Sequence, residues 1–196
     1  MGHDRIGIMG GTFDPIHMGH LVAAEGVRVE LRLDRVVFVP AARPPHKQAA
    51  GISDGDRRLE MTRMATEDNP AFEVSDLELR RSGTSYTIDT VRQLRAGFGP
   101  GVDLFFLMGV DSLMEITTWK EYESLLEEMT VVVFPRPGLD PSSVDGAVRD
   151  RVRFVSTCEV GLASSDIRER VRKSKSIRYL VHPAVEAFVQ QEGLYR

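Results

Sequence analysis

The amino-acid sequence predicts an α/β fold in which a doubly wound, mostly parallel sheet carries helices on both faces. Short apolar runs rich in branched and aromatic residues alternate along the chain with longer runs that have apolar residues at helical spacing. About six runs of the first kind occur, and parallel strands need helical crossovers between them. At 196 residues and 42% hydrophobic side chains, the chain suits one domain over 1–196.

The strands are predicted where branched and aromatic side chains cluster over a few residues, as in a largely buried sheet. They cover Arg5–Met9, Arg35–Val39, Phe72–Leu79, Val102–Met108, Thr130–Phe134 and Val152–Val155. Ligands of such sheets bind beyond the carboxyl ends of the strands, so the loops that follow the strands should form the site.

The helices are predicted where apolar residues recur every three or four positions. They cover Gly19–Leu33, Asp54–Glu67, Ser85–Ala96, Trp119–Glu128, Ser143–Arg149, Ser164–Lys173 and Pro183–Gln191. The Pro/Gly-rich stretches Pro40–Gly55 and Pro135–Ser143 are too short for domain linkers and are predicted to be loops.

Composition argues against several classes of partner. The chain has 25 Lys+Arg against 29 Asp+Glu, a formal charge of −4, which disfavours nucleic acid and membrane surfaces. Its one cysteine, Cys158, has no internal disulfide partner, and no run of about 18 apolar residues or export signal is present. We expect a protein of the reducing cytoplasm that binds neither nucleic acid nor membrane.

The segment Gly10–His20 joins the first strand to the first helix and is the richest in chemical groups. Two glycines let the backbone approach a ligand, and the N–H groups at the start of a helix attract phosphate. His17 and His20 stand three residues apart, so both rings can face the loop and donate to phosphate oxygens.

Other interpretations of this segment are a tight Gly-Gly turn with histidines that only cap the helix, and a zinc site that includes Asp14. The zinc interpretation is weaker because the HExxH pattern is absent. Asp14 could instead orient a loop group or a hydrated magnesium ion, and we also expect it among the residues that bind the second substrate.

The eleven residues GGTFDPIHMGH resemble the first signature of the bacterial nicotinate mononucleotide adenylyltransferases, within the nucleotidyltransferase superfamily that carries an HxGH motif. The resemblance implies a Rossmann-like fold and contacts of His17 and His20 with ATP phosphates, which stabilise charge as pyrophosphate leaves. It also implies that the nucleotide is lined by Gly10, Gly11, Thr12, Phe13 and, further along the chain, Gly109.

Four further motifs occur in the order and at the spacing of this family. They are Pro44–Lys47 (PPHK), Ser85–Thr90 (SYTIDT), Gly109–Asp111 with Trp119, and Arg136–Gly138. Each alone is common as a surface loop, a helix cap or a turn. Together they extend the resemblance over nearly the whole chain.

These motifs suggest how a mononucleotide is held. Lys47 and His46 on a Pro-stiffened loop can bring donors and charge to phosphates from the side opposite the histidines, with Arg43 assisting. Asp111 follows a strand and can accept hydrogen bonds from ribose hydroxyls, the alternative being a helix N-cap. Trp119 can offer a platform for a flat ring, although without the family we would assign it to the core.

The pyridine pocket is predicted at two helix starts. Thr118 and Glu121 fit a capping box, and Ser85 opens another helix. The resemblance places the ring substituent between the backbone N–H groups of Thr87 and Lys120, above Trp119. Because both groups only donate, a carboxylate should bind better than an amide.

Leu162–Arg168 (LASSDIR) resembles the second signature of the family, ISSTxIR. Ala163 replaces its first serine and Ser165 its threonine, but the helix start and Arg168 remain. The resemblance assigns ATP contacts to Ser164, Ser165, Ile167 and Arg168. The closing stretch 179–195 also resembles the family, and we interpret its His182 as structural.

The implied reaction is attack of the phosphate of nicotinate mononucleotide on the α-phosphorus of ATP. His17, His20, Lys47 and Arg168 would be catalytic, with Mg²⁺ held mainly by substrate phosphates and no metal ligands from the protein. A phosphopantetheine adenylyltransferase and a non-catalytic nucleotide-binding domain are the alternatives, and assembly into a homo-oligomer is left open.

Overall fold

A computed structural model describes residues 4–43 and 52–196 and contains one six-stranded, all-parallel sheet. The strands are β1 (Asp4–Gly11), β2 (Arg35–Pro40), β3 (Phe72–Val74), β4 (Val102–Gly109), β5 (Thr130–Phe134) and β6 (Arg153–Phe154). The strand order is β3-β2-β1-β4-β5-β6. Successive strands are added on one side of β1 up to β3, and on its other side from β4 onward, so the switch point lies between β1 and β4. The predicted doubly wound, Rossmann-like fold is confirmed.

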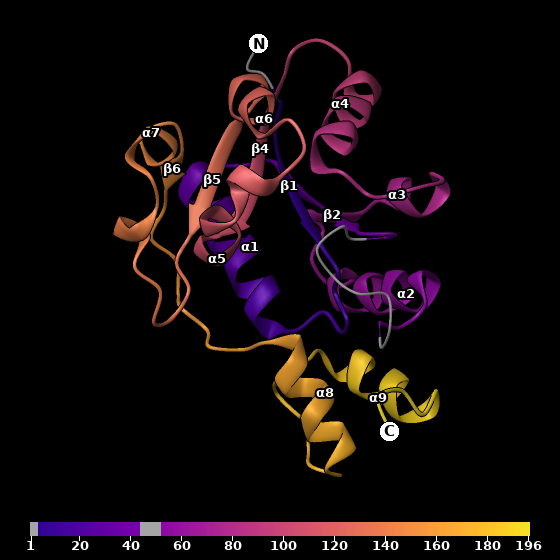
Figure 1. Ribbon diagram of the computed structural model, residues 1–196. Coiled ribbons are helices and arrows are strands. Elements are labelled where there is room, and N and C mark those ends of the chain that lie inside the picture. Colours follow the sequence, from indigo (N-terminus) through magenta and orange to yellow (C-terminus); the bar gives the residue numbers. More distant parts are fainter. Residues whose placement is uncertain (1–3, 44–51) are drawn as a thin grey trace.

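Helices cover both faces of this sheet (Figure 1). They are α1 (Met18–Leu31), α2 (Gly55–Thr66), α3 (Leu77–Arg80), α4 (Thr87–Phe98), α5 (Val110–Met114), α6 (Tyr122–Glu128), α7 (Gly146–Arg149), α8 (Ser164–Arg172) and α9 (Pro183–Gln191). Short 3₁₀ turns η1 (Ile116–Thr118) and η2 (Pro141–Ser143) lie between some of them.

The strands alternate their side chains between two apolar cores. In β4, Phe105 and Leu107 pack with α1, α8 and α9, whereas Leu104, Phe106 and Met108 pack with α4, α5 and α6. Because the central strands β1, β2, β4 and β5 are largely buried on both faces, their sequences are almost continuously apolar, and this is the signal from which they are predicted.

Strand β3 is shorter than predicted. The run Phe72–Leu79 was expected to be one strand, but pairing ends at Val74 and α3 begins at Leu77. The hydroxyl of Ser75 accepts a hydrogen bond from the N–H of Leu77 at 3.3 Å, and Asp76 is the N-cap residue. A polar local turn therefore overrides the apolar alternation.

The predicted helix Trp119–Glu128 and its capping box are also wrong. Trp119 is extended, its N–H donates to the carbonyl of Ile116 at 2.9 Å, and α6 begins only at Tyr122. The hydroxyl of Thr118 donates back to Glu115 instead of capping a helix. The predicted helix Ser143–Arg149 is likewise shortened, since α7 begins at Gly146 with Asp145 as its cap.

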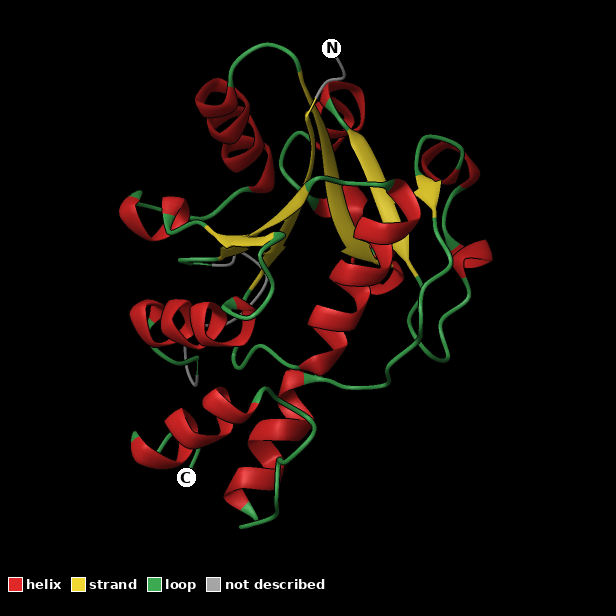
Figure 2. Ribbon diagram, turned by 180° about the vertical axis from the view of Figure 1, so that it is seen from behind, coloured by secondary structure: helices red, strands yellow, loops and turns green. Residues whose placement is uncertain are grey.

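The last two helices, α8 and α9, lie together at the end of the molecule toward which the central strands run (Figure 2). The segment between them contacts the start of α1, because the N–H of Met18 donates to the carbonyl of Leu180 at 2.9 Å. No helix within residues 4–43 and 52–196 is long and apolar enough to cross a membrane.

Candidate active site

A cavity of about 590 Å³ lies beyond the carboxyl ends of β1, β4 and β5. Its walls come from the loop after β1, from Asp111 and the turn after β5, and from the start of α8. The predicted site residues among its lining are Thr12, Phe13, Asp14, His17, His20, Asp111, Ser164, Ser165 and Arg168. Segments about 150 positions apart in the sequence, the two signature-like motifs, thus share one cavity.

His17 and His20 form a stacked pair at the start of α1. Their ring centres are 3.7 Å apart and the planes differ by 25°. The backbone N–H of His17, the N-cap residue, donates to Nδ1 of His20 at 3.2 Å. A Cβ atom at Gly19 would lie 3.1 Å from the His17 ring, so the glycine between the histidines makes room for the stack.

Both histidine rings are suited to donate hydrogen bonds. Burial, and next the positive charge of Arg136, lower the pKa of His17 to about 4, so its ring is neutral at neutral pH. Because Nδ1 of His20 accepts from the backbone, the proton of its neutral ring is on Nε2. The His17 side chain in turn faces the backbone N–H of His20, the third residue of α1, which favours its Nε2 for the proton as well.

Asp14 is almost fully buried and is held by three segments. Its carboxylate accepts from the hydroxyl of Tyr195 at 2.7 Å and from the N–H of Ser53 at 3.2 Å. Its backbone carbonyl accepts from Nη1 of Arg168 at 2.7 Å. Asp14 was predicted to contact the mononucleotide, but in the structure its carboxylate chiefly anchors the loop.

The start of α8 faces the same cavity. The hydroxyl of Ser164 donates to the carbonyl of Pro15 at 2.9 Å, which ties α8 to the loop after β1. Ser165 is exposed on the cavity wall, and the alanine side chain of the N-cap residue Ala163 cannot accept from the first N–H groups of the helix. Ile167 is fully buried in the core, which leaves only its backbone for ligand contact.

Asp111 is half exposed and is the second residue of α5, whose N-cap is Gly109. The alternative of an N-cap role for Asp111 is therefore wrong. A Cβ atom at Gly109 would meet the side chains of Asp111 and Arg136 in their present positions, so the glycine leaves room for this pair. Nε of Arg136 lies 3.5 Å from Asp111 Oδ1, and the sequence analysis treated this arginine only as part of a turn.

The residues predicted to hold the pyridine ring lie outside the lining of this cavity; they are Thr87, Trp119 and Lys120. Trp119 is partly buried and packs edge-on against Phe106, with ring centres 6.1 Å apart. Thr87 is the first residue of α4, so its N–H has no partner within the helix. Gly10 and Gly11 end β1, and His46 and Lys47 lie outside the described residues.

Arg58 is a buried residue of the site region that the sequence analysis missed. Its guanidinium donates to the carbonyls of Thr12 at 2.7 Å, Ser53 at 2.9 Å and Ala42 at 3.4 Å. Burial lowers its pKa from the ordinary arginine value. Its signal in the sequence is a charge on the apolar face of a predicted helix, one turn before Met61 and Thr62, which are also buried.

The loop after β2 is tied to the start of α4. The hydroxyl of Ser85 accepts from the N–H groups of Ala42 and Arg43 at 3.0 and 3.2 Å. The N–H of Ser85 in turn donates to the carbonyl of Arg43 at 3.1 Å. The segment that leads into the PPHK motif is therefore anchored beside Thr87.

Comparison with known proteins finds consistent similarity. Residues 8–170 match the family described as cytidylyltransferase-like. Two "probable nicotinate-nucleotide adenylyltransferases" are similar over 98% of this chain: that of Moorella thermoacetica is 45% identical over 92% of its own length, and that of Thermus thermophilus 47% over 100%. The fold matches that of Plasmodium falciparum nicotinic acid mononucleotide adenylyltransferase complexed with NaAD, with a TM-score of 0.81, 20% identity and 98% coverage of both chains.

Proposed function

This chain belongs to the cytidylyltransferase-like family and, within it, to the nicotinate-nucleotide adenylyltransferases, and we propose that it transfers the adenylyl group of ATP to nicotinate mononucleotide. The products are nicotinate adenine dinucleotide and pyrophosphate, and the reaction belongs to the synthesis of NAD. Residues 1–196 would form one nucleotidyltransferase domain.

One observation carries this proposal: the histidine pair and the start of α8 line the same cavity. A triphosphate needs several donors around a water-accessible groove, because its charge is spread over many oxygens. His17, His20, Ser165 and Arg168 supply side-chain donors, and the first turn of α8, which begins at Ser164, supplies backbone N–H groups.

The reaction needs no covalent intermediate on the protein. A phosphate oxygen of the mononucleotide attacks the α-phosphorus of ATP, and the bond from that phosphorus to the β-phosphate oxygen breaks. The electron pair leaves with pyrophosphate, whose growing negative charge is stabilised by Nε2–H of His17 and of His20 and by Arg168. Neutral rings serve here as hydrogen-bond donors, so neither histidine must change its protonation state.

We propose Mg²⁺ as the divalent ion of the reaction. Among the described residues, no group of three His, Cys, Asp or Glu side chains is placed to hold a metal. The ion would therefore be held mainly by the phosphate oxygens of the substrates and by water. When bound, Mg²⁺ would neutralise phosphate charge and orient the triphosphate.

The second substrate is proposed to lie toward α4, with its pyridine ring on Trp119 and its ribose at Asp111. The ring carboxylate would accept from the N–H groups of Thr87 and Lys120. Only the first of these belongs to a helix start, so the dipole contribution that we expected from a second helix is absent. The two donors alone still favour the acid over the amide.

Pyrophosphate release tests the proposal when ATP is offered with nicotinate mononucleotide, nicotinamide mononucleotide or phosphopantetheine in separate reactions. We expect release with the first compound and a dinucleotide of matching mass. Release only with phosphopantetheine would identify the related adenylyltransferase instead. Binding of ATP with no release for any acceptor would favour a nucleotide-binding domain. We also propose a cytoplasmic location, which suits a chain with a single cysteine.

A further inference from the structure

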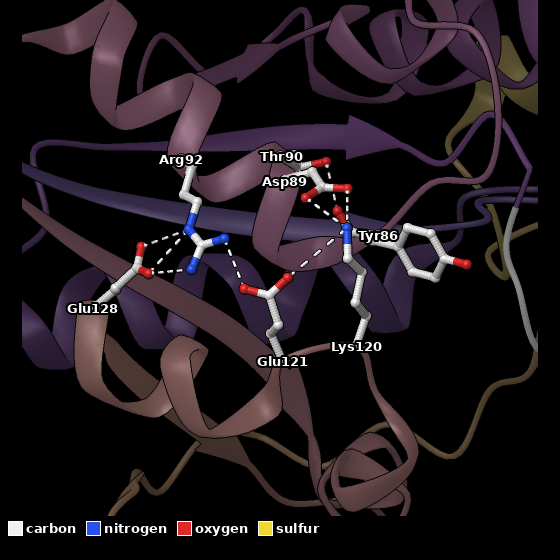
Figure 3. A network of polar contacts seen from close by, with 7 residues as sticks. All are labelled: Tyr86, Asp89, Thr90, Arg92, Lys120, Glu121 and Glu128. Carbon is white, nitrogen blue, oxygen red and sulfur yellow. Dashed lines mark hydrogen bonds and ion pairs between the residues drawn. The ribbon is translucent and has the colours of Figure 1, made fainter.

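A chain of charged side chains joins the first turn of α4 to the segment that carries Trp119 (Figure 3). Nζ of Lys120 lies 3.1 Å from both carboxylate oxygens of Asp89, the third residue of α4. The same Nζ lies 4.9 Å from the ring centre of Tyr86, the N-cap residue of that helix. Lys120 therefore contacts the start of α4 through two residues, Asp89 and Tyr86.

A second bridge runs beside the first. Nη1 of Arg92, one turn after Asp89, lies 2.8 Å from a carboxylate oxygen of Glu121. Its Nε and Nη2 donate to Glu128, at the end of α6, at 3.0 and 2.6 Å. The hydrogen bonds to these carboxylates raise the pKa of Arg92 further above its ordinary value.

These contacts explain a local backbone that the sequence analysis did not predict. Glu121 has a φ of 50°, in the left-handed region that non-glycine residues seldom adopt. Its side chain is held by Arg92 and lies 3.9 Å from Lys120, so the turn from Trp119 to Tyr122 is fixed on the surface of α4. The network thus selects a turn where the residue pattern favoured a helix.

We propose that the Asp89–Lys120 pair, supported by Arg92 and Glu121, is a positioning device that sets the pocket for the pyridine carboxylate. This inference rests on the proposed function. The two donors of that pocket are backbone N–H groups of Thr87 and Lys120. Asp89 shares the first turn of α4 with Thr87, so an ion pair between Asp89 and Lys120 fixes the separation of the donors.

Charge gives the pair a second role. Asp89 lies in the helical turn where the substrate carboxylate would bind, and its negative charge opposes that of the acid. Lys120 cancels this charge while it holds the loop. The loss of Lys120 should therefore weaken binding of the acid more than the loss of Asp89 does. The loss of Lys120 should also weaken binding of the amide less than it weakens binding of the acid.

The single tryptophan of the chain makes a direct test available, because Trp119 alone supplies the tryptophan fluorescence. Titration with nicotinate mononucleotide, read as a change in that fluorescence, gives Kd without turnover. The side chains of the pair are 35–40% exposed, and such pairs contribute modestly even within a network. We expect Lys120→Met to raise Kd by about threefold to tenfold and Asp89→Asn by less.

The double variant Asp89→Asn/Lys120→Met should have the same Kd as Asp89→Asn, since the unpaired negative charge that Lys120→Met leaves on Asp89 is then absent. The KM for ATP and the thermal midpoint should stay close to wild type. Lys173→Met is the matched control, because Lys173 is an exposed lysine paired with Glu169 on α8. It should leave Kd for the mononucleotide unchanged.

The inference is overturned if neither single variant changes Kd, if the losses add in the double variant, or if the KM for ATP rises as much as Kd for the acid. These results are separable from failure of the proposed function. If wild type forms no dinucleotide from ATP and nicotinate mononucleotide, the function itself is wrong, whatever the variants bind.

Discussion

The hydroxyl of Tyr195 donates a hydrogen bond to the carboxylate of Asp14 at 2.7 Å, although 181 positions separate the two residues. Burial raises the pKa of Tyr195 above the ordinary value, so the hydroxyl stays protonated and donates. Asp14 is 2% exposed and lies in the loop that places His17. The end of the chain is therefore part of the support of the histidine pair.

Tyr195→Phe should lower the free energy of unfolding by about 1–3 kcal/mol, because it removes a donor from a buried carboxylate. The KM for ATP should also rise as the loop loses its anchor. Urea denaturation and steady-state kinetics check both effects. Tyr179→Phe is the control, since Tyr179 is 86% exposed; equal stability of the two variants would refute the role of the Tyr195 hydroxyl.

Replacement of His17 or His20 by alanine should lower kcat by about a hundredfold or more while folding is kept, because each removes an aligned donor to developing charge. Turnover is measured by pyrophosphate release and folding by circular dichroism. If both variants retained wild-type turnover but melted earlier, the pair would be structural only.

His17 also gives a prediction about pH. Its pKa is lowered to about 4 in the folded protein, so between the unfolded value near 6.5 and 4 the unfolded chain binds more protons. Its contribution to stability is complete above pH 6.5 and is lost as pH falls toward 4, at up to about 1.4 kcal/mol per pH unit. A His17→Asn variant should lose stability less steeply over this range in urea titrations; identical slopes would contradict the shift.

Arg58→Met should cost about 3 kcal/mol or more in free energy of unfolding, since three backbone carbonyls lose their donor in the interior. Activity should fall too, because Thr12 and Ala42 belong to loops around the site. Arg57→Met provides a neighbouring control on the exposed side of α2, where Arg57 pairs with Glu192 at 3.5 Å. Similar thermal midpoints for the two variants would rule out the proposed anchoring.

Arg168→Ala should raise the KM for ATP more than that for the mononucleotide, because Arg168 lines the cavity beside the histidines while Trp119 lies elsewhere. Arg172→Ala, on an exposed position one turn later, should change neither constant. A rise confined to the mononucleotide would show that our division of the cavity is reversed.

The sequence predicted the central strands well because β1, β2, β4 and β5 are largely buried on both faces, so that each appears as an apolar run. The two short motifs that resemble known signatures also predicted one phosphate site from the histidine loop and the start of α8, and both segments line the same cavity. The roles assigned to single residues in the site remain predictions. Those assigned to His46 and Lys47 fall outside the described residues.

Other features could not be predicted because they depend on contacts between distant segments. The extended Trp119 and left-handed Glu121 are stabilised by Asp89 and Arg92 of another helix, whereas the local pattern of Thr118 and Glu121 favours a capping box. The anchoring of Asp14 by Tyr195 likewise appears only once the chain is folded.

The most direct test of the account is the ratio of kcat/KM for nicotinate mononucleotide to that for nicotinamide mononucleotide, both measured with saturating ATP by pyrophosphate release. The pocket donors at Thr87 and Lys120 satisfy a carboxylate, whereas an amide leaves one buried group unpaired at a cost of about 1–3 kcal/mol. We therefore predict a ratio of about ten to a hundred or more in favour of the acid. Equal values for the two substrates, or no pyrophosphate release with the acid, would contradict the account.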